Sequence, residues 1–281
     1  FVNGVASASG ALLLRYFLAV MLKVVTPFQL LEISRPDHPL LQMILRNAPG
    51  TYQHSLQVAN LAERAAEAIG ADALLTRVGA LFHDVGKAVN PNAFIENQLP
   101  GQENPHDTTD PYTSAEWVLQ HVTDGLQIAR KYRIPPRIQD FIREHHGTLL
   151  TRYQYSKALQ AAGNDPAKVD IEKFRYPGPP PQSRETTLIM FADGCEARAR
   201  AELPTTEEHL RNLVKEQIQF YRNEGQLDNT DFTFRELSLV VESFVSTLKS
   251  THHLRIKYPK IHNQTHAEIT EKTLSKQEAK S

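Results

Sequence analysis

Residues 78–87 read VGALFHDVGK, and this stretch decides how the rest of the chain is interpreted. Apolar and small residues run directly into His83 and Asp84, which are followed by Gly86 and Lys87. An imidazole next to a carboxylate near a helix end can offer one metal ion a nitrogen and a second ion a shared oxygen. The same pair also occurs at capped helix ends that bind nothing, so residues elsewhere in the chain must decide between the two interpretations.

The segments around this stretch have the periodicity of helices. Apolar residues recur at helical spacing in four of them: 51–69, 72–82, 113–132 and 185–201. Thr205 with Glu208, and Thr233 with Glu236, have the spacing of a capping box and predict two further helix starts. No run of alternating apolar and polar residues is long enough to predict a strand. We therefore predict an all-α fold, built as a helical bundle.

The composition is that of a globular protein in a reducing compartment. The 281 residues are 41% hydrophobic and 22% charged, and the formal net charge is −1. Cys195 is the single cysteine, which excludes a disulfide framework and a cysteine-rich zinc site. The near-zero net charge argues against a nucleic-acid polymer as partner.

Both ends of the chain differ from its middle. Residues 1–25 are the most apolar part, and on a helix Arg15 and Lys23 lie about 80° apart. This segment is the end of a membrane helix, an amphipathic helix on a membrane or a partner, or a buried helix of the domain. Residues 259–281 are polar and are predicted to be a disordered tail. We expect residues 26–258 to form the folded domain between them.

Residues able to bind metal recur on separate predicted helices. They are His54, His83, Asp84, His121, His145, His146 and Asp193. Each residue also has an interpretation without a metal. His54 can be a hydrogen-bonded core histidine and His121 a surface residue, and Asp193 can pair with Arg198 or Arg200. Helical bundles do build dinuclear sites from ligands that point inward from separate helices. Seven ligands are too many for one six-coordinate ion, so the set favours two.

The order of these residues resembles that of the HD-domain metal-dependent phosphohydrolases. Over about residues 26–260 the chain is similar to the cytosolic domain of the seven-transmembrane-receptor HD hydrolases, the PgpH-type cyclic-di-AMP phosphodiesterases. The motifs that carry this resemblance are NAPGTYQHSLQVANLAE (47–63), VGALFHDVGK (78–87), IENQ (95–98), NPHD (104–107), HHGT (145–148), RYPGPPPQSRE (175–185), FADGCEA (191–197) and ESFVSTLKSTHHLRIKYP (242–259).

The resemblance implies an HD-domain helical bundle with a dinuclear metal site. One ion is then held by His54, His83, Asp84 and Asp193. The other is held by Asp84, His121, His145 and His146. The resemblance implies iron or manganese, and the residues themselves, which supply imidazole and carboxylate but no thiolate, favour the same metals and leave zinc and cobalt open.

The implied activity is hydrolysis of cyclic-di-AMP to linear pApA. Two metal ions activate a water as hydroxide for this reaction, so no protein nucleophile is needed. Asp84, as the shared ligand, and Lys87 are the expected catalytic residues; Lys87 either reaches a phosphate oxygen or is a solvated lysine at a helix end. The candidate contacts to the cyclic dinucleotide are Tyr52, Asn104, His106, Arg175 and Tyr176.

The resemblance also implies a location. The N-terminal part of the parent protein would attach the domain to the membrane, at the cytoplasmic face of the bacterial cell membrane. A homodimer is left open.

Two alternative functions remain. A cyclic-di-GMP phosphodiesterase would carry an acidic residue and a Gly-Tyr-Pro signature after the histidine pair, and HHGTLLTRYQY (145–155) has neither. A nucleotide sensor with an HD fold but no activity would be expected to have lost a ligand, and none is lost here. Triphosphohydrolases and (p)ppGpp hydrolases of the HD type usually need one metal, which leaves His121, His145 and His146 unexplained.

Overall fold

The computed structural model describes residues 2–21, 25–99 and 101–251. These residues contain no strand, and their one isolated bridge joins Leu150 to Arg175. The predicted all-α fold is confirmed. The α-helices are α1 (Val2–Met21), α2 (Pro27–Ile33), α3 (Pro39–Asn47), α4 (Pro49–Ile69), α5 (Ala73–Phe82), α6 (Pro105–Thr108), α7 (Pro111–Lys131), α8 (Pro136–Glu144), α9 (Arg152–Ala161), α10 (Arg184–Glu202), α11 (Glu207–Asn223) and α12 (Phe234–Thr251). The short 3-10 helices are η1 (Val85–Ala88), η2 (Pro91–Ala93), η3 (Ile95–Asn97), η4 (Pro166–Lys168) and η5 (Ile171–Phe174).

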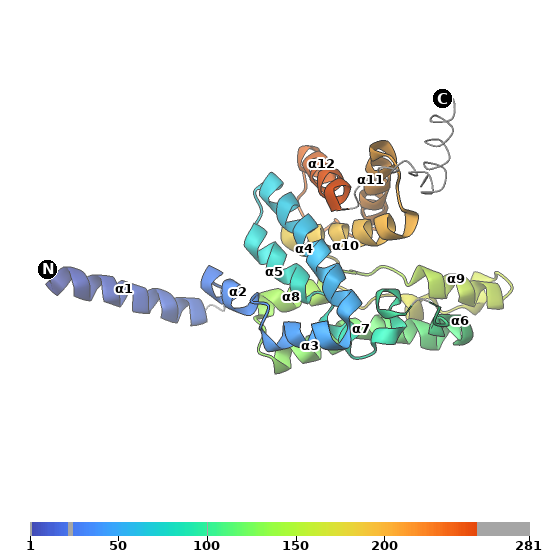
Figure 1. Cartoon of the computed structure of the whole chain (residues 1–281), viewed down its shortest axis with the longest axis horizontal. Coiled ribbons are helices and arrows are strands. Elements are labelled where there is room, and N and C mark those ends of the chain that lie inside the picture. The colour runs from blue at the N-terminus through green and yellow to red at the C-terminus, as the bar shows by residue number, and fades with distance from the viewer. Residues whose placement is uncertain (1, 22–24, 100, 252–281) are drawn as a thin grey trace, which may run out of the picture.

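Helix α4 lies at the centre of the bundle and packs against α3, α5, α10 and α12 (Figure 1). Its small residues Ala59, Ala62, Ala65 and Ala66 are fully buried and allow these neighbours to approach closely. The helix ends at Gly70, which adopts the left-handed conformation that favours glycine and turns the chain back into α5. The two helices that carry His54 and precede His83 are therefore held side by side.

A close approach of backbones fixes the HDVGK turn. His83 ends α5, Asp84 precedes η1, and η1 packs directly against α7. A Cβ atom at Gly86 would lie 1.8 Å from the main-chain oxygen of His121, and one at Gly125 would lie 3.3 Å from the nitrogen of Gly86. Two glycines thus let the turn contact α7 without a side chain between them, and this contact brings Asp84 to His121.

A second, smaller core lies on the other side of α7. It consists of Ala115, Ala158, Val169 and Phe174. These residues come from α7, α9 and the segment that follows α9, so the segment between α9 and α10 is anchored to the bundle through Val169 and Phe174. The proline-rich residues after Phe174 then lead to α10 without forming a helix or a strand. The anchoring places Arg175 and Tyr176 at the start of this proline-rich run.

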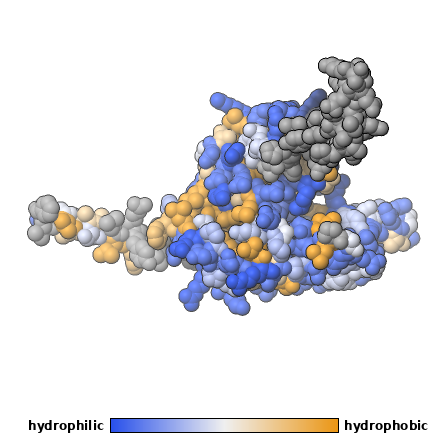
Figure 2. All heavy atoms as spheres, in the orientation of Figure 1, coloured by the Kyte–Doolittle hydropathy of each residue, from blue (hydrophilic) through white to orange (hydrophobic). Residues whose placement is uncertain are grey.

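Helix α1 extends away from the bundle (Figure 1). Its apolar side chains Val5, Leu13, Leu14 and Phe17 are exposed. Apolar residues are also visible on the part of the bundle nearest to α1 (Figure 2). Among the described residues, no helix combines the length and apolar character that a membrane span requires. The predicted boundary after residue 25 stays a prediction, and the predicted tail, residues 259–281, lies outside the described residues.

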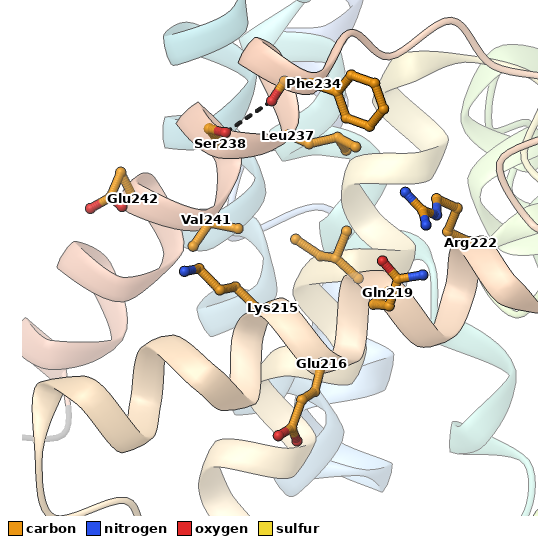
Figure 3. Close-up of a pocket in the computed structure, with 10 residues that line it drawn as sticks. Lys215, Glu216, Gln219, Arg222, Phe234, Leu237, Ser238, Val241 and Glu242 are labelled. Atoms are coloured by element: carbon orange, nitrogen blue, oxygen red, sulfur yellow. Dashed lines mark hydrogen bonds between the residues drawn. The ribbon is translucent and has the colours of Figure 1, made fainter.

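A cavity of about 600 Å³ lies between α11 and α12 (Figure 3). Lys215, Gln219 and Arg222 face Leu237 and Val241 across it. None of the residues that line it belongs to the predicted site. The predicted chemistry must therefore be sought elsewhere, at the contact of α4, α5, α7 and α10.

One of the two predicted capping boxes is displaced. Thr233 and Glu236 form the expected reciprocal hydrogen bonds before α12. At α11, however, the cap is Thr206, whose side chain accepts a hydrogen bond from the nitrogen of His209. The prediction of Thr205 with Glu208 was wrong by one residue, because two consecutive threonines offer the same chemistry and the path of the chain selects the second.

We predict that Gly86→Ala destabilises the chain. The added Cβ meets main-chain atoms of α7, which cannot rotate away, so the free energy of unfolding should fall by about 1–3 kcal/mol. At about 2–4 °C per kcal/mol, thermal unfolding followed by circular dichroism should show a clear decrease in midpoint. Gly10→Ala on α1 is the matched control, because a Cβ there meets nothing within 4 Å. An unchanged midpoint for Gly86→Ala would contradict the close packing of η1 on α7.

Candidate metal centre

The Asp84 carboxylate lies at the centre of a cluster of imidazoles, and its side chain is 1% exposed. Its Oδ2 lies 3.2 Å from the Nε2 of His83 and 3.7 Å from the Nε2 of His54. Its Oδ1 lies 3.5 Å from the Nε2 atoms of both His121 and His145. The two oxygens of one carboxylate therefore face two different pairs of histidines.

Two groups of potential ligands result, and both contain Asp84. In the first, the ligand atoms of His54, His83 and Asp84 lie within 4.8 Å of one another. In the second, the same holds for Asp84, His121, His145 and His146. The seventh predicted residue, Asp193, lies between the groups: its Oδ1 is 3.0 Å from His54 Nε2 and its Oδ2 is 3.8 Å from His146 Nδ1. The fold thus gathers all seven predicted residues, from helices far apart in sequence, at one place.

Each imidazole that faces Asp84 is oriented through its other ring nitrogen. In three of them Nδ1 lies against a main-chain oxygen three residues earlier: His83 against Ala80 at 2.7 Å, His121 against Val118 at 2.6 Å and His145 against Ile142 at 3.0 Å. Because a carbonyl can only accept, Nδ1 carries the proton and Nε2 presents its lone pair toward Asp84. In His54, Nδ1 lies instead 2.6 Å from Oε2 of the buried Glu196.

This geometry can be compared with known proteins. The family model for the HD domain matches residues 51–198, more than half of the chain. The chain belongs to the HD domain family. The cyclic-di-AMP phosphodiesterase PgpH of Bacillus subtilis (strain 168) is 42% identical over 258 residues, which are 92% of this chain and 36% of that protein. The chain spans about a third of the length of the curated relatives it matches.

Two solved structures of the PgpH HD domain of L. monocytogenes are also similar. Both are 39% identical to this chain and are covered completely by it. One superposes with a TM-score of 0.71 and covers 77% of this chain. The other, in complex with cyclic-di-AMP, has a TM-score of 0.73 and covers 78%. The resemblance found in the sequence is confirmed at the level of the domain.

The residues of this HD domain fit a divalent metal. Among the described residues, four buried side-chain polar atoms have no hydrogen-bond partner, and three of them lie in this cluster: Nε2 of His83 and both oxygens of Asp84. Buried polar atoms are normally paired, and these three are of the type that binds metal and face one another. Imidazole and carboxylate without thiolate suit iron, manganese or zinc, so the donor set itself does not select one metal.

Protonation of the histidines differs between the two groups. Burial lowers the pKa of His121 to about 3 and that of His146 well below its usual range, against the opposite effects of Asp84 and Asp193. Both rings are therefore neutral and able to bind metal at neutral pH. Burial also acts to lower the pKa of His54, but hydrogen bonds to Asp193 and Glu196 raise it to about 10.

Lys87 lies at the edge of the centre and is not solvated as one interpretation of the sequence allowed. Its Nζ is 2.8 Å from Oδ2 of Asp84 and 3.0 Å from Oε1 of Glu96, and the side chain is 12% exposed. Burial alone would raise the pKa of Asp84, but the charge of Lys87 beside it helps to hold that pKa well below its usual range. Glu96 in turn accepts a hydrogen bond from Thr51. The ammonium is thus fixed beside the candidate metal ligands.

The predicted substrate contacts separate into two sets. The ring of Tyr176 stacks on His146, with centroids 4.2 Å apart and planes at 29°, so this residue adjoins the ligand cluster. Arg175 precedes it and donates from Nη1 to the main-chain oxygen of Thr148, which ties the proline-rich segment to the loop after His146. Tyr52 is half-buried on α4, and its ring packs against the core.

The other two predicted contacts have partners within the protein. Asn104 caps α6 by accepting from the nitrogen of His106. Both ring nitrogens of His106 are used, since Nδ1 is 2.7 Å from Ser114 Oγ and Nε2 is 2.6 Å from the main-chain oxygen of Ala93. These bonds hold the NPHD segment in place and leave no free ring nitrogen on His106.

Two carboxylates in the centre received no role from the sequence. Glu196 follows Asp193 by three residues, a spacing that puts both on one face of a helix and marks Glu196 as a second inward group. Glu96 lies in the IENQ motif, where nothing in the local pattern points to Lys87. The sequence spacing thus could have identified Glu196, whereas no sequence pattern indicates the contact of Glu96 with Lys87.

We predict that a divalent cation stabilises this HD domain. Mn²⁺ added to the metal-free chain should raise the thermal midpoint, because the folded state alone gathers the ligands; the gain is about 2.7 kcal/mol at a concentration one hundred times Kd. A chelator should reverse it. His83→Gln should remove most of the shift, whereas His209→Gln, at an exposed histidine on α11, should keep it. If Mn²⁺ raised the thermal midpoint of His83→Gln and His209→Gln equally, the ion would bind at a site that does not include His83.

Proposed function

We propose that this HD domain hydrolyses cyclic-di-AMP to linear pApA with two divalent metal ions, iron or manganese. The observation that carries the proposal is the solved PgpH HD domain of L. monocytogenes in complex with cyclic-di-AMP, which this chain covers completely at 39% identity. The gathered ligand set adds support, since a domain that had become a sensor would be expected to lack some of its ligands.

The geometry around Asp84 supports two ions rather than one. Its two oxygens face separate pairs of histidines, and each pair belongs to a group that can surround an ion. Divalent ions supply Lewis acidity toward a phosphodiester and lower the pKa of water. In the proposed assignment Asp84 is common to both ions, Asp193 completes the group of His54, and His146 completes the group of His121.

The chain's own residues supply binding and orientation. The Lys87 ammonium lies beside Asp84 and is held there by Glu96, where it can donate to a phosphate oxygen of the substrate. Tyr176 covers His146 with one face of its ring and narrows the approach to the ligands. Arg175 keeps this segment against Thr148, so we assign it an indirect role in substrate binding.

Membrane attachment is part of the same proposal. The exposed apolar side chains of α1 support a segment that lies against a membrane or joins a membrane-embedded part. The domain would then work at the cytoplasmic face of the bacterial cell membrane. A homodimer stays a prediction that rests on the sequence resemblance alone.

We predict that cyclic-di-AMP is consumed faster than cyclic-di-GMP when both are offered at equal concentration with Mn²⁺. The closed ring holds the scissile phosphate in one geometry, whereas linear pApA must lose entropy to bind again, so pApA should accumulate. Chromatography of the products measures both. Faster loss of the guanine compound would overturn the substrate. Binding without turnover would favour a sensor, and rapid cleavage of a linear oligoribonucleotide would indicate a nucleic-acid polymer.

We predict that Asp84→Asn abolishes hydrolysis while the helical fold survives. The amide has nearly the same volume but lacks the charge and one of the two acceptor oxygens, so the shared ligand is lost. A thousandfold loss of kcat/KM corresponds to about 4 kcal/mol. Asp37→Asn, at an exposed carboxylate, is the control and should keep full activity. Turnover by Asp84→Asn above about a tenth of the wild-type rate would be incompatible with a catalytic role for Asp84.

A further inference from the structure

The histidines around Asp84 are not held alike. Of the four imidazoles whose Nε2 faces this carboxylate, His83, His121 and His145 rest on main-chain oxygens of their own helices. His54 instead lies against a side chain 142 residues away, the carboxylate of Glu196. Three of the rings thus have a neutral acceptor and one has a charged acceptor.

Glu196 is buried as deeply as the ligands themselves. It lies on α10, one turn after Asp193, and its side chain is 1% exposed. Its Oε2 is 2.6 Å from Nδ1 of His54, and its Oε1 is 3.8 Å from Nη1 of Arg200, which reaches in from the surface. A buried carboxylate costs free energy unless it is paired. The pairing with His54 therefore explains why Glu196 is buried, although Glu196 has no direct part in the proposed reaction.

A charged acceptor at Nδ1 changes how strongly Nε2 of the same imidazole can bind a metal ion. A carboxylate draws the Nδ1 proton more strongly than a carbonyl does, which leaves more electron density on Nε2. It also fixes the ring orientation, so that Nε2 can bind metal once the proton it shares with Asp193 is released. Loss of such a partner typically reduces metal affinity about 10- to 100-fold.

We propose that Glu196 is a positioning residue that makes the His54 side of the centre, formed by His54, His83, Asp84 and Asp193, the tighter of the two metal positions. This rests on the proposed dinuclear site. The other side has neutral acceptors at Val118 and Ile142 and so binds its ion more weakly.

The test is a stepwise titration of the metal-free full chain with Mn²⁺, in which free Mn²⁺ is counted by electron paramagnetic resonance. The wild-type chain should bind one ion tightly and a second more weakly. Glu196→Gln keeps an acceptor oxygen but removes the charge, and should weaken the tight step about 10- to 100-fold while sparing the weak step. Glu196→Ala removes both and should weaken the tight step further. Asp193→Asn shows which metal position the tight step belongs to. Asp193 is assigned to the His54 side, so this variant should also weaken the tight step.

Glu144→Gln is the matched control. Glu144 is 3% exposed and immediately precedes His145, yet its Oε2 accepts from the nitrogen of Gln182 rather than from a ligand imidazole. It should titrate like the wild-type chain. Circular dichroism of each metal-free variant checks the fold, and if Glu196→Ala does not fold, Glu196→Gln carries the test.

The outcomes are separable. Unchanged binding by Glu196→Gln, or weakening of the weak step or of both steps equally, would overturn the role of Glu196. A wild-type chain that binds a single ion would overturn this proposal together with the dinuclear site. Turnover of cyclic-di-AMP is measured in parallel; its absence with two normal binding steps would refute the proposed activity and leave the role of Glu196 intact.

Discussion

The carboxylate of Asp84 is buried where no hydrogen bond satisfies either of its oxygens, and the rest of the centre depends on this constraint. A charge taken out of water costs several kcal/mol unless opposite charge lies close to it. The Lys87 ammonium at 2.8 Å supplies one such charge, whereas the imidazoles of His121 and His146, whose pKa values burial lowers, supply lone pairs rather than further positive charge. The remaining unpaired oxygens of Asp84 support the proposed binding of divalent cations between the helices that converge on this side chain.

For these side chains to meet at Asp84, the backbones of their helices must also approach closely. Asp84 meets His121 only because η1 contacts α7 directly, and Gly86 and Gly125 leave no Cβ atoms in the way. On the opposite side, the small residues of α4 bring His54 near α10, where Asp193 and Glu196 share one helix face. Glycines and alanines far from any chemistry thus determine the distances on which the chemistry depends.

Much of this was readable in the sequence, and the limits have physical causes. Long periodic segments such as residues 51–69 predict helices because burial of one face is a property of the pattern itself. The seven candidate ligands were identifiable from residue type and order. The position of the α11 cap was not, since Thr205 and Thr206 are chemically equivalent. Roles such as the structural bonds of His106, or the contact between Glu96 and Lys87, depend on folded distances that no local pattern contains.

Exposure shows from which side a substrate reaches the centre. The side chains of His83, Asp84, His121 and His145 are at most 1% exposed, whereas His146 is 21%, Asp193 14% and Lys87 12% exposed. The open edge is therefore lined by one residue of each proposed metal group and by the ammonium, with Tyr176 stacked beside them. In the proposed function, a phosphodiester that enters here would meet positive charge and both groups of candidate ligands at once, while the carboxylate of Asp84 stays behind them, out of contact with water.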